Sequence, residues 1–202
     1  MKNQLQKANT AVIVIDVQND YVHNDGFLGK VLGTKSLQGK VGKMNQFLEQ
    51  IRAKNVPIIH IQMTEGRNTI DPALKEENIK KHGDYKNWEL AIPGTWGYEL
   101  VLKVNNEEKI FKKNAYDTFG NKEFGVHLEE QGIRNLVIFG GYTHACVNAT
   151  VRSAFKKRFN VILVKDLVGS PDKLQELHEK ALATLTAEYA QGYDAAEVVN
   201  LF

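Results

Sequence analysis

Short hydrophobic runs alternate along the chain with segments whose hydrophobic residues recur every three or four positions. The runs are typical of strands that are buried on both faces of a parallel sheet. They cover residues 11–16, 56–62, 108–113, 135–141 and 160–166. The periodic segments have the spacing of amphipathic helices, and they cover residues 36–54, 122–132, 144–158 and 170–190. Strands that alternate with helices predict parallel βαβ units, with helices on both faces of one sheet.

Two parts of the chain are harder to assign. The last residues, 197–202, read EVVNLF and are predicted as a candidate edge strand. Residues 63–95 contain charges and two prolines without clear periodicity, which in a compact domain is usual for a functional segment or for small helices. Because the chain has 202 residues and no internal repeat or low-complexity linker, we expect residues 1–202 to form one α/β domain.

The composition is that of an ordinary globular protein and argues against several classes of function. The formal net charge is +2, which gives no support for a nucleic-acid partner. No hydrophobic run reaches the roughly 20 residues that a membrane-spanning helix needs, and the first ten residues contain no apolar signal core. The single cysteine cannot form an internal disulfide. We therefore expect a cytoplasmic protein that binds neither membrane nor nucleic acid.

Three reactive side chains stand at the ends of predicted strands. Asp16 ends the first strand, Lys113 ends the third, and Cys146 begins the helix that follows the fourth. In parallel α/β sheets, ligands bind beyond the carboxyl ends of the strands. Because these ends share one edge of the sheet, we expect the three side chains to lie close together although they are far apart in the sequence.

These three residue types together suit nucleophilic catalysis by a cysteine. A cysteine thiolate is the useful nucleophile, and a helix N-terminus or a nearby lysine lowers the pKa of the thiol. An aspartate within reach can take the thiol proton and later return it to a leaving amine. Gly140 and Gly141, which precede the cysteine, allow a sharp turn that aims backbone N–H groups at a developing oxyanion.

Each of these residues also has a structural interpretation that spacing alone leaves open. Asp16 is equally typical of a turn or a helix cap. Lys113, taken alone, is typical of an exposed surface lysine, and Cys146 is typical of a small buried core residue. The position of all three at strand ends favours the catalytic interpretation.

Four segments carry a resemblance to a known family. In chain order they read AVIVIDVQNDYV (11–22), IPGTWGYEL (92–100), IFKKNAYDTFGN (110–121) and LVIFGGYTHACVNATVRSAFKKRFNVILVKD (136–166). In these segments the chain resembles the isochorismatase-like cysteine hydrolases, and the resemblance covers nearly the whole chain. The superfamily includes nicotinamidases, N-carbamoylsarcosine amidases, ureidoacrylate and biuret hydrolases, and isochorismatase.

The resemblance implies a fold and a set of roles. The fold is a three-layer α/β/α sandwich with a mostly parallel, Rossmann-like sheet of six strands. Asp16 would be the general base and acid, Lys113 the catalytic lysine and Cys146 the nucleophile. A cis peptide bond would join Gly141 to Tyr142, and the backbone N–H groups of Tyr142 and Cys146 would form the oxyanion hole. Homodimers or homotetramers are common in the family.

The implied activity is hydrolysis of a C–N bond in a small amide or in a carbamoyl or ureido compound, through a thioester on the cysteine. Two alternatives are kept open. One is an isochorismatase-type hydrolase that acts on a small metabolite without a covalent intermediate. The other is a non-catalytic binding protein on the same fold.

A metal site is not expected. Nicotinamidases bind a metal through an Asp-x-His motif after the second strand, and residues 58–71 contain no such motif. His60 falls inside a predicted strand, Glu65 stands alone, and His82 with Asp84 supplies only two ligands, which are too few for a transition metal. We therefore predict that the protein uses neither a metal nor another cofactor.

The substrate pocket can be assigned only to candidates. Aromatic and imidazole side chains near the predicted site are the natural choices. The candidates are Tyr21, His60, Trp88, Tyr116 and His144. Residues 63–95 are expected to set specificity, and the sequence does not identify the substrate.

Overall fold

The computed structural model describes residues 4–65, 72–73, 76, 80 and 90–202. Within these residues, six strands form one sheet in the order β3-β2-β1-β4-β5-β6, and every neighbouring pair is parallel. The strands are β1 (Thr10–Ile15), β2 (Ile58–Met63), β3 (Lys109–Lys113), β4 (Asn135–Gly141), β5 (Asn160–Gly169) and β6 (Gln191–Tyr193). The predicted βαβ architecture is therefore confirmed, with the first strand at the centre of the sheet.

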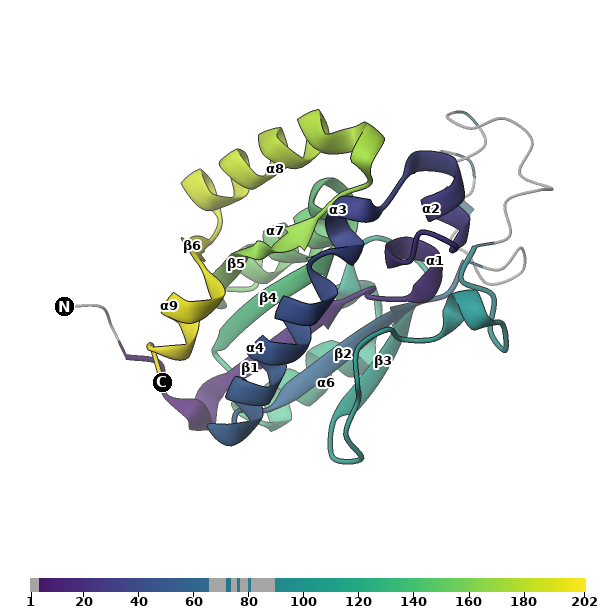
Figure 1. The fold of residues 1–202 in the computed structure, drawn as a ribbon. Helices are drawn as coiled ribbons and strands as arrows, with labels where there is room; N and C mark the ends of the chain where they lie inside the picture. Colours follow the sequence, from purple (N-terminus) through teal and green to yellow (C-terminus); the bar gives the residue numbers. More distant parts are fainter. Residues whose placement is uncertain (1–3, 66–71, 74–75, 77–79, 81–89) are drawn as a thin grey trace.

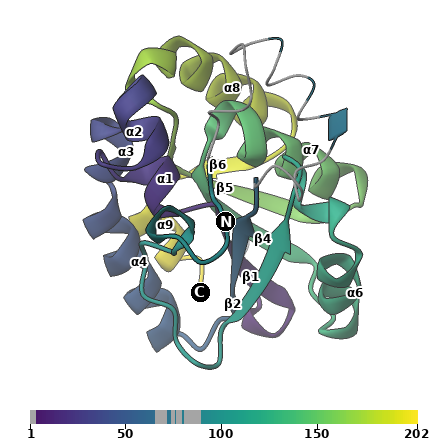
Figure 2. The same ribbon diagram turned by 90° about the vertical axis from the view of Figure 1, so that its right-hand side faces the viewer.

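Helices cover both faces of the sheet. Figure 2 shows α4 and α9 on one face and α6 and α7 on the other, which gives the three-layer arrangement predicted from the family resemblance. The helices are α1 (Asn19–Val22), α2 (Phe27–Leu32), α3 (Lys35–Gln38), α4 (Val41–Ala53), α6 (Lys122–Glu130), α7 (Asn148–Lys156), α8 (Gln175–Glu188) and α9 (Ala195–Val199). Short helices α1 and α2 gather at the end of the sheet where β1 and β2 finish (Figure 1).

The core forms because the central strands are apolar on both faces. All six residues of β1 are buried, as expected for a strand in the middle of a covered parallel sheet. On one face, α4 buries its apolar stripe of Met44, Phe47, Leu48 and Ile51. No helix in the described part of the chain is long and apolar enough to cross a membrane.

The predicted helix over residues 36–54 is divided in two. Gly39 ends α3, and α4 begins at Val41. A glycine destabilises a helix interior because its backbone loses more conformational freedom than that of other residues. The break lets the chain turn between a short helix near the site and a long helix on the sheet.

The prediction of an edge strand at residues 197–202 is wrong. The chain forms helix α9 there, and the sixth strand lies earlier, at Gln191–Tyr193. The physical reason is a capping box: the Glu197 carboxylate accepts a hydrogen bond from the N–H of Asp194 at 3.1 Å, which stabilises a helix start. Val198 is then buried in the core from a helix rather than from a strand.

Glycine at position 140 brings β4 close to the end of β1. Gly140 has a φ of +124°, and a Cβ atom there would lie 2.1 Å from the carbonyl oxygen of Ile15. Only glycine fits both the backbone angle and the space. The register between β4 and β5 also shifts between Ile138 and Gly140, so the sheet is distorted where the chain leaves it for the cysteine.

Candidate active site

Asp16 leaves the end of β1 with an unusual backbone. Its φ is +50°, in the left-handed region that a non-glycine residue enters at a cost of about 1–3 kcal/mol. Hydrogen bonds on both sides hold it there: its N–H donates to the carbonyl of Ile61, and its carbonyl accepts from the N–H of Gln18. Its side chain is fully buried. Strain of this kind, stabilised by surrounding structure, is typical of functional sites.

Lys113 joins the other two residues at the carboxyl edge of the sheet. Its Nζ lies 2.7 Å from Oδ2 of Asp16 and 3.1 Å from Sγ of Cys146. It also donates to the carbonyl of Ala115 at 3.0 Å. A third hydrogen bond runs to Sδ of Met63 at 3.4 Å, and the contact with Asp16 is an ion pair. We call Asp16, Lys113 and Cys146 the carboxyl-edge cluster.

Cys146 lies in a turn that is wider than an α-helical one. The π-type turn Thr143–Val147 leads directly into α7, and the N–H of Val147 donates to the carbonyl of Tyr142, five residues back. In an α-helical turn that carbonyl would take the N–H of Cys146 instead. The peptide bond between Gly141 and Tyr142 is cis. The Cys146 side chain is buried, with 6% of its surface exposed.

The pKa of the Cys146 thiol shifts in the direction opposite to the one expected from the sequence. Burial raises the pKa of the Cys146 thiol, Asp16 raises it further, and Lys113 only partly opposes them, so the net shift is upward rather than downward. Burial also raises the pKa of Asp16, against the lowering effect of Lys113. Burial alone lowers the pKa of Lys113, but Asp16 and the cysteine outweigh it and the net shift is upward.

These directions assign a protonation state to the resting cluster. Lys113 is an ammonium ion because its pKa is raised. Cys146 keeps its proton, and Asp16, whose pKa burial raises, is the nearby base that can receive it. The same ammonium ion lies within 3.1 Å of the sulfur, so it would stabilise a thiolate at the moment the proton leaves.

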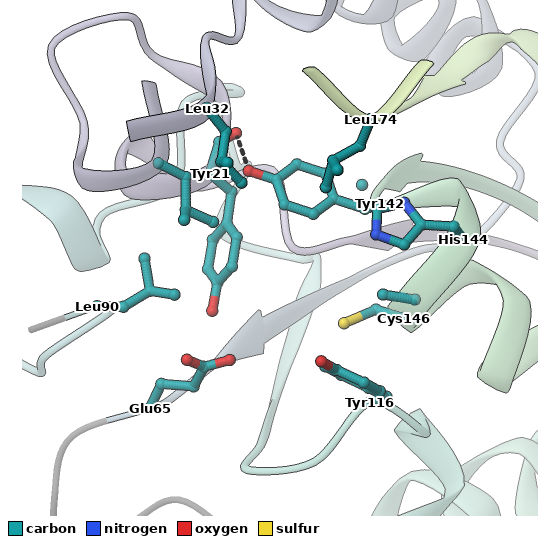
Figure 3. Close-up of a pocket in the computed structure, with 12 residues that line it drawn as sticks. Tyr21, Leu32, Glu65, Leu90, Tyr116, Tyr142, His144, Cys146 and Leu174 are labelled. Atoms are coloured by element: carbon teal, nitrogen blue, oxygen red, sulfur yellow. Dashed lines mark hydrogen bonds between the residues drawn. The ribbon is translucent and has the colours of Figure 1, made fainter. Parts of the chain in front are cut away.

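A pocket opens beside the cysteine. It holds about 580 Å³ of space that atoms do not fill, a volume that includes the solvent at its open mouth. Its described lining residues are Tyr21, Leu28, Leu32, Glu65, Leu90, Tyr116, Gly141, Tyr142, His144, Ala145, Cys146 and Leu174. Figure 3 shows the Cys146 sulfur and the Tyr116 hydroxyl directed into the same open space. Asp16 and Lys113 are not among the described lining residues, so Cys146 is the member of the cluster that lines the pocket.

The predicted pocket residues divide into three groups. Tyr21, Tyr116 and His144 line the pocket. Trp88 lies outside the described residues, as do His82 and Asp84, which were weighed as a ligand pair. His60 is not a described lining residue, because its position within β2 is set back from the carboxyl edge.

His60 instead belongs to a second, partly buried group of ionisable side chains. Its Nε2 lies 2.9 Å from the carboxylate of Glu108, which also accepts two hydrogen bonds from Arg52, at 2.7 and 3.0 Å. Glu108 immediately precedes the first residue of β3. We call Arg52, His60 and Glu108 the amino-edge cluster.

The sequence analysis missed Glu65 as a pocket residue. Glu65 follows β2 by two positions and is 4% exposed, with its side chain in the pocket wall. The sequence indicates it only as a lone potential metal ligand. The signal that identified Asp16, a carboxylate directly after a buried strand, also applies to Glu65.

Two polar residues that follow Asp16 form hydrogen bonds with the backbone segments around the site. Gln18 bonds both backbone groups of Met63, with Nε2 donating to the carbonyl and Oε1 accepting from the N–H. Asp20 accepts hydrogen bonds from the N–H groups of Phe27 and Ala91. These two side chains therefore connect the end of β1 to β2, to α2 and to the described residues that follow position 89.

Two histidines anchor the turn that carries the cysteine. Nδ1 of His144 lies 2.8 Å from Oγ of Ser170, and Nδ1 of His178 lies 2.8 Å from Oγ1 of Thr143. The Thr143–Val147 turn is thus tied to the start of α8. Among the described residues, no group of three His, Cys, Asp or Glu side chains could hold a metal ion.

Comparisons with known proteins place the chain in a family. The isochorismatase domain model matches residues 10–197. The ureidoacrylate amidohydrolase RutB of Agrobacterium fabrum is 26% identical over 187 residues, which cover 85% of this chain and 82% of that protein.

Solved structures share the fold. A cysteine hydrolase from Pseudomonas syringae pv. phaseolicola has a TM-score of 0.83 at 20% identity and covers 98% of this chain and 94% of its own. N-carbamoylsarcosine amidase from Thermoplasma acidophilum has a TM-score of 0.75 at 21% identity, with 93% and 96% covered. The resemblance found in the sequence is confirmed: because the family model spans most of its length, the chain belongs to the isochorismatase family of hydrolases.

Proposed function

We propose that this protein hydrolyses a C–N bond in a small amide or in a carbamoyl or ureido compound, with Cys146 as the nucleophile. One observation carries the proposal: Lys113 contacts both Asp16 and Cys146, at 2.7 and 3.1 Å, and Cys146 lines a pocket. The relative RutB, named as a ureidoacrylate amidohydrolase, supports a carbonyl bonded to nitrogen as the target.

The proposed cycle uses the cluster twice. Asp16 takes the proton of Cys146 as the sulfur attacks the substrate carbonyl carbon, and Lys113 stabilises the thiolate. The oxyanion accepts hydrogen bonds from the backbone N–H groups of Tyr142 and Cys146. The C–N bond then breaks, and the amine or ammonia leaves with the proton from Asp16.

The second half of the cycle releases the acid. The acyl group remains on Cys146 as a thioester. Asp16, again a carboxylate, takes a proton from water as the water oxygen attacks the thioester carbon. The C–S bond breaks and the sulfur recovers the proton, which regenerates the thiol and frees a carboxylic or carbamic acid.

The test is ammonia release from a panel of small compounds. The panel contains simple amides, N-carbamoyl amino acids, ureido acids including ureidoacrylate, and nicotinamide. We expect the wild-type protein to release ammonia from at least one of them. We expect Cys146→Ala to lose at least about 10⁴-fold of that rate, because it lacks the nucleophile, with unchanged circular dichroism.

Two outcomes would favour the alternatives. Full activity of Cys146→Ala on the true substrate would replace the covalent route by an isochorismatase-type hydrolysis without a thioester. Tight binding of a panel compound with no turnover by the wild-type protein would favour a non-catalytic binding protein.

We also propose that residues 1–202 form one domain that assembles as a homodimer or homotetramer in the cytoplasm. The family match over residues 10–197 supports a single domain. Size-exclusion chromatography with light scattering measures the assembly. A monomer at micromolar concentration would contradict the proposed oligomer.

A further inference from the structure

Three leucine side chains form one end of the pocket that Cys146 lines. Leu28 and Leu32 lie one turn apart on α2, and Leu174 is the last residue of the short helical turn η6 (Asp172–Leu174), directly before α8. All three line the same pocket as the cysteine. Leu32 and Leu174 are only partly buried, so they leave apolar surface that a bound molecule can cover.

The ring of Tyr142 continues this apolar surface toward the cysteine. Its hydroxyl is engaged within the protein, since Oη donates to the Tyr21 carbonyl at 2.6 Å. Figure 3 shows the Tyr142 ring between the Leu32 and Leu174 side chains and the Cys146 sulfur. A group attached to a carbonyl carbon at Cys146 therefore has an aromatic ring and then leucine side chains along its path.

Hydrogen bonds hold the two leucine-bearing segments together. The carboxylate of Asp172 accepts from the N–H of Ser36 at 3.0 Å and from its Oγ at 2.6 Å. Nζ of Lys173 donates to the carbonyl of Val31, in the last turn of α2, at 2.9 Å. Leu174 comes next in the chain, so its position against α2 is fixed before a ligand binds. A preformed apolar surface binds more tightly because less ordering accompanies binding.

We infer that Leu28, Leu32, Leu174 and the ring of Tyr142 form an apolar subsite for a hydrocarbon part of the substrate. The subsite takes an alkyl or aromatic group attached to the carbonyl compound that Cys146 attacks. Each CH₂ group that is fully buried there strengthens binding about fourfold. This inference rests on the proposed function, because Cys146 marks the reacting end of the pocket.

The test uses the single cysteine as a reporter. Cys146 is the only cysteine of the chain, so thiol reagents label one position. Methyl and n-butyl methanethiosulfonate transfer a methylthio or a butylthio group to it with the same leaving group. The labelling rate with each reagent is divided by its rate with free cysteine. The quotient of these two values, butyl over methyl, is called the butyl preference, and the protonation state of the thiol cancels in it.

The variants are Leu174→Asn, Leu174→Met and Leu177→Asn. Leu174→Asn replaces the hydrocarbon end of the side chain by an amide of similar size, and Leu174→Met keeps the position apolar. Leu177→Asn makes the first change three residues later, at a leucine on α8 that is 46% exposed and is not among the described lining residues. Circular dichroism measures the folding of each variant before labelling.

We expect a butyl preference of at least about fivefold in the wild-type protein, because the longer chain reaches the apolar subsite. The preference should fall at least about threefold in Leu174→Asn and stay near the wild-type value in Leu174→Met and Leu177→Asn. A wild-type preference near one would overturn the subsite, whether or not Leu174→Asn folds. An unchanged preference in folded Leu174→Asn would also overturn it, as would a thiol that neither reagent labels, because the pocket would then admit neither group.

Labelling does not require turnover, which separates this inference from the proposed function. If Cys146→Ala keeps full activity while the wild-type protein shows the butyl preference, the covalent mechanism fails and the subsite stands. If the wild-type protein hydrolyses acetamide with a kcat/KM equal to or above that for pentanamide and its butyl preference is near one, the subsite fails and the hydrolase stands.

Discussion

The buried carboxyl-edge cluster and the partly buried amino-edge cluster differ in how many hydrogen bonds their carboxylates accept. In the amino-edge cluster, Glu108 accepts hydrogen bonds from Arg52, from the N–H of Asn105 and from the ring of His60. In the carboxyl-edge cluster, Asp16 has the ammonium group of Lys113 at 2.7 Å. The Oδ1 atom of Asp16 is buried and has no hydrogen-bond partner among the described residues.

This difference indicates which cluster stabilises the fold and which can take part in a reaction. A buried carboxylate with all its acceptor sites filled is fixed and has little left to give to a reaction. A buried carboxylate with unused sites, which shares the ammonium group of Lys113 with a pocket-lining thiol, can accept a proton. Proteins keep such incomplete arrangements where function needs them, at a cost in stability. The comparison therefore predicts that the carboxyl-edge cluster controls activity and the amino-edge cluster controls stability.

The largest expected effect is on activity, at Lys113. In Lys113→Met we expect kcat/KM for the proposed hydrolysis to fall by at least about 10³-fold, because the thiolate loses the ammonium group that stabilises it. The matched control is Lys112→Met, one residue earlier on the exposed side of β3. Steady-state kinetics on both variants measures the difference. Equal losses of kcat/KM in the two would contradict the claim that the carboxyl-edge cluster controls activity.

The next effect is on stability, at Glu108. In Glu108→Gln we expect the free energy of unfolding to fall by about 1–2 kcal/mol, because Arg52 loses its partly buried ionic partner. Urea denaturation monitored by circular dichroism measures this change. A loss below about 0.5 kcal/mol would show that the amino-edge cluster is not a stabilising element.

The smallest effect is a pH dependence that involves His60. Burial lowers the pKa of this imidazole, against the raising effect of Glu108. The unfolded chain, with a histidine pKa of about 6.5, therefore binds the proton more readily than the native protein. The stabilising contribution of neutral His60 is complete above that value and is lost as pH falls toward the lower native pKa.

The measurement is the free energy of unfolding from pH 7.5 to pH 5. We expect the wild-type value to fall more steeply with decreasing pH than that of His60→Gln, which has no titratable group at position 60 and keeps the other five histidines. Parallel curves for the two proteins would mean that the environment of His60 does not favour the neutral form.

Much of the fold could be predicted from the sequence because its signals are local. The runs around β1, β2, β4 and β5 are apolar enough to identify buried strands, and their carboxyl ends then indicated which side chains share an edge. The strand Gln191–Tyr193 was missed because three residues with a central glycine have no hydrophobic pattern. Residues 197–202 were misassigned because the β-branched pair Val198 and Val199 outweighed the capping signal of Asp194 and Glu197.

The site was less predictable because it depends on distances. The sequence could propose that Lys113 lies near Cys146, but not that burial and Asp16 together raise the pKa of the thiol above its ordinary value. It also could not tell that His60 faces Glu108, since the two meet only through the pairing of β2 with β3. Glu65 carries the same kind of signal as Asp16, a carboxylate close to the carboxyl end of a buried strand.

The most direct test changes one carboxylate to an amide in each cluster and compares activity per folded molecule. The variants are Asp16→Asn and Glu108→Gln, and the folded fraction of each is measured by circular dichroism before ammonia release is assayed. We predict that Asp16→Asn loses at least about 10³-fold of the wild-type rate, as expected when a proton acceptor is removed, while Glu108→Gln stays within about threefold of it. A folded Asp16→Asn protein with near wild-type activity, or an equal loss in Glu108→Gln, would contradict the assignment of chemistry to the carboxyl edge.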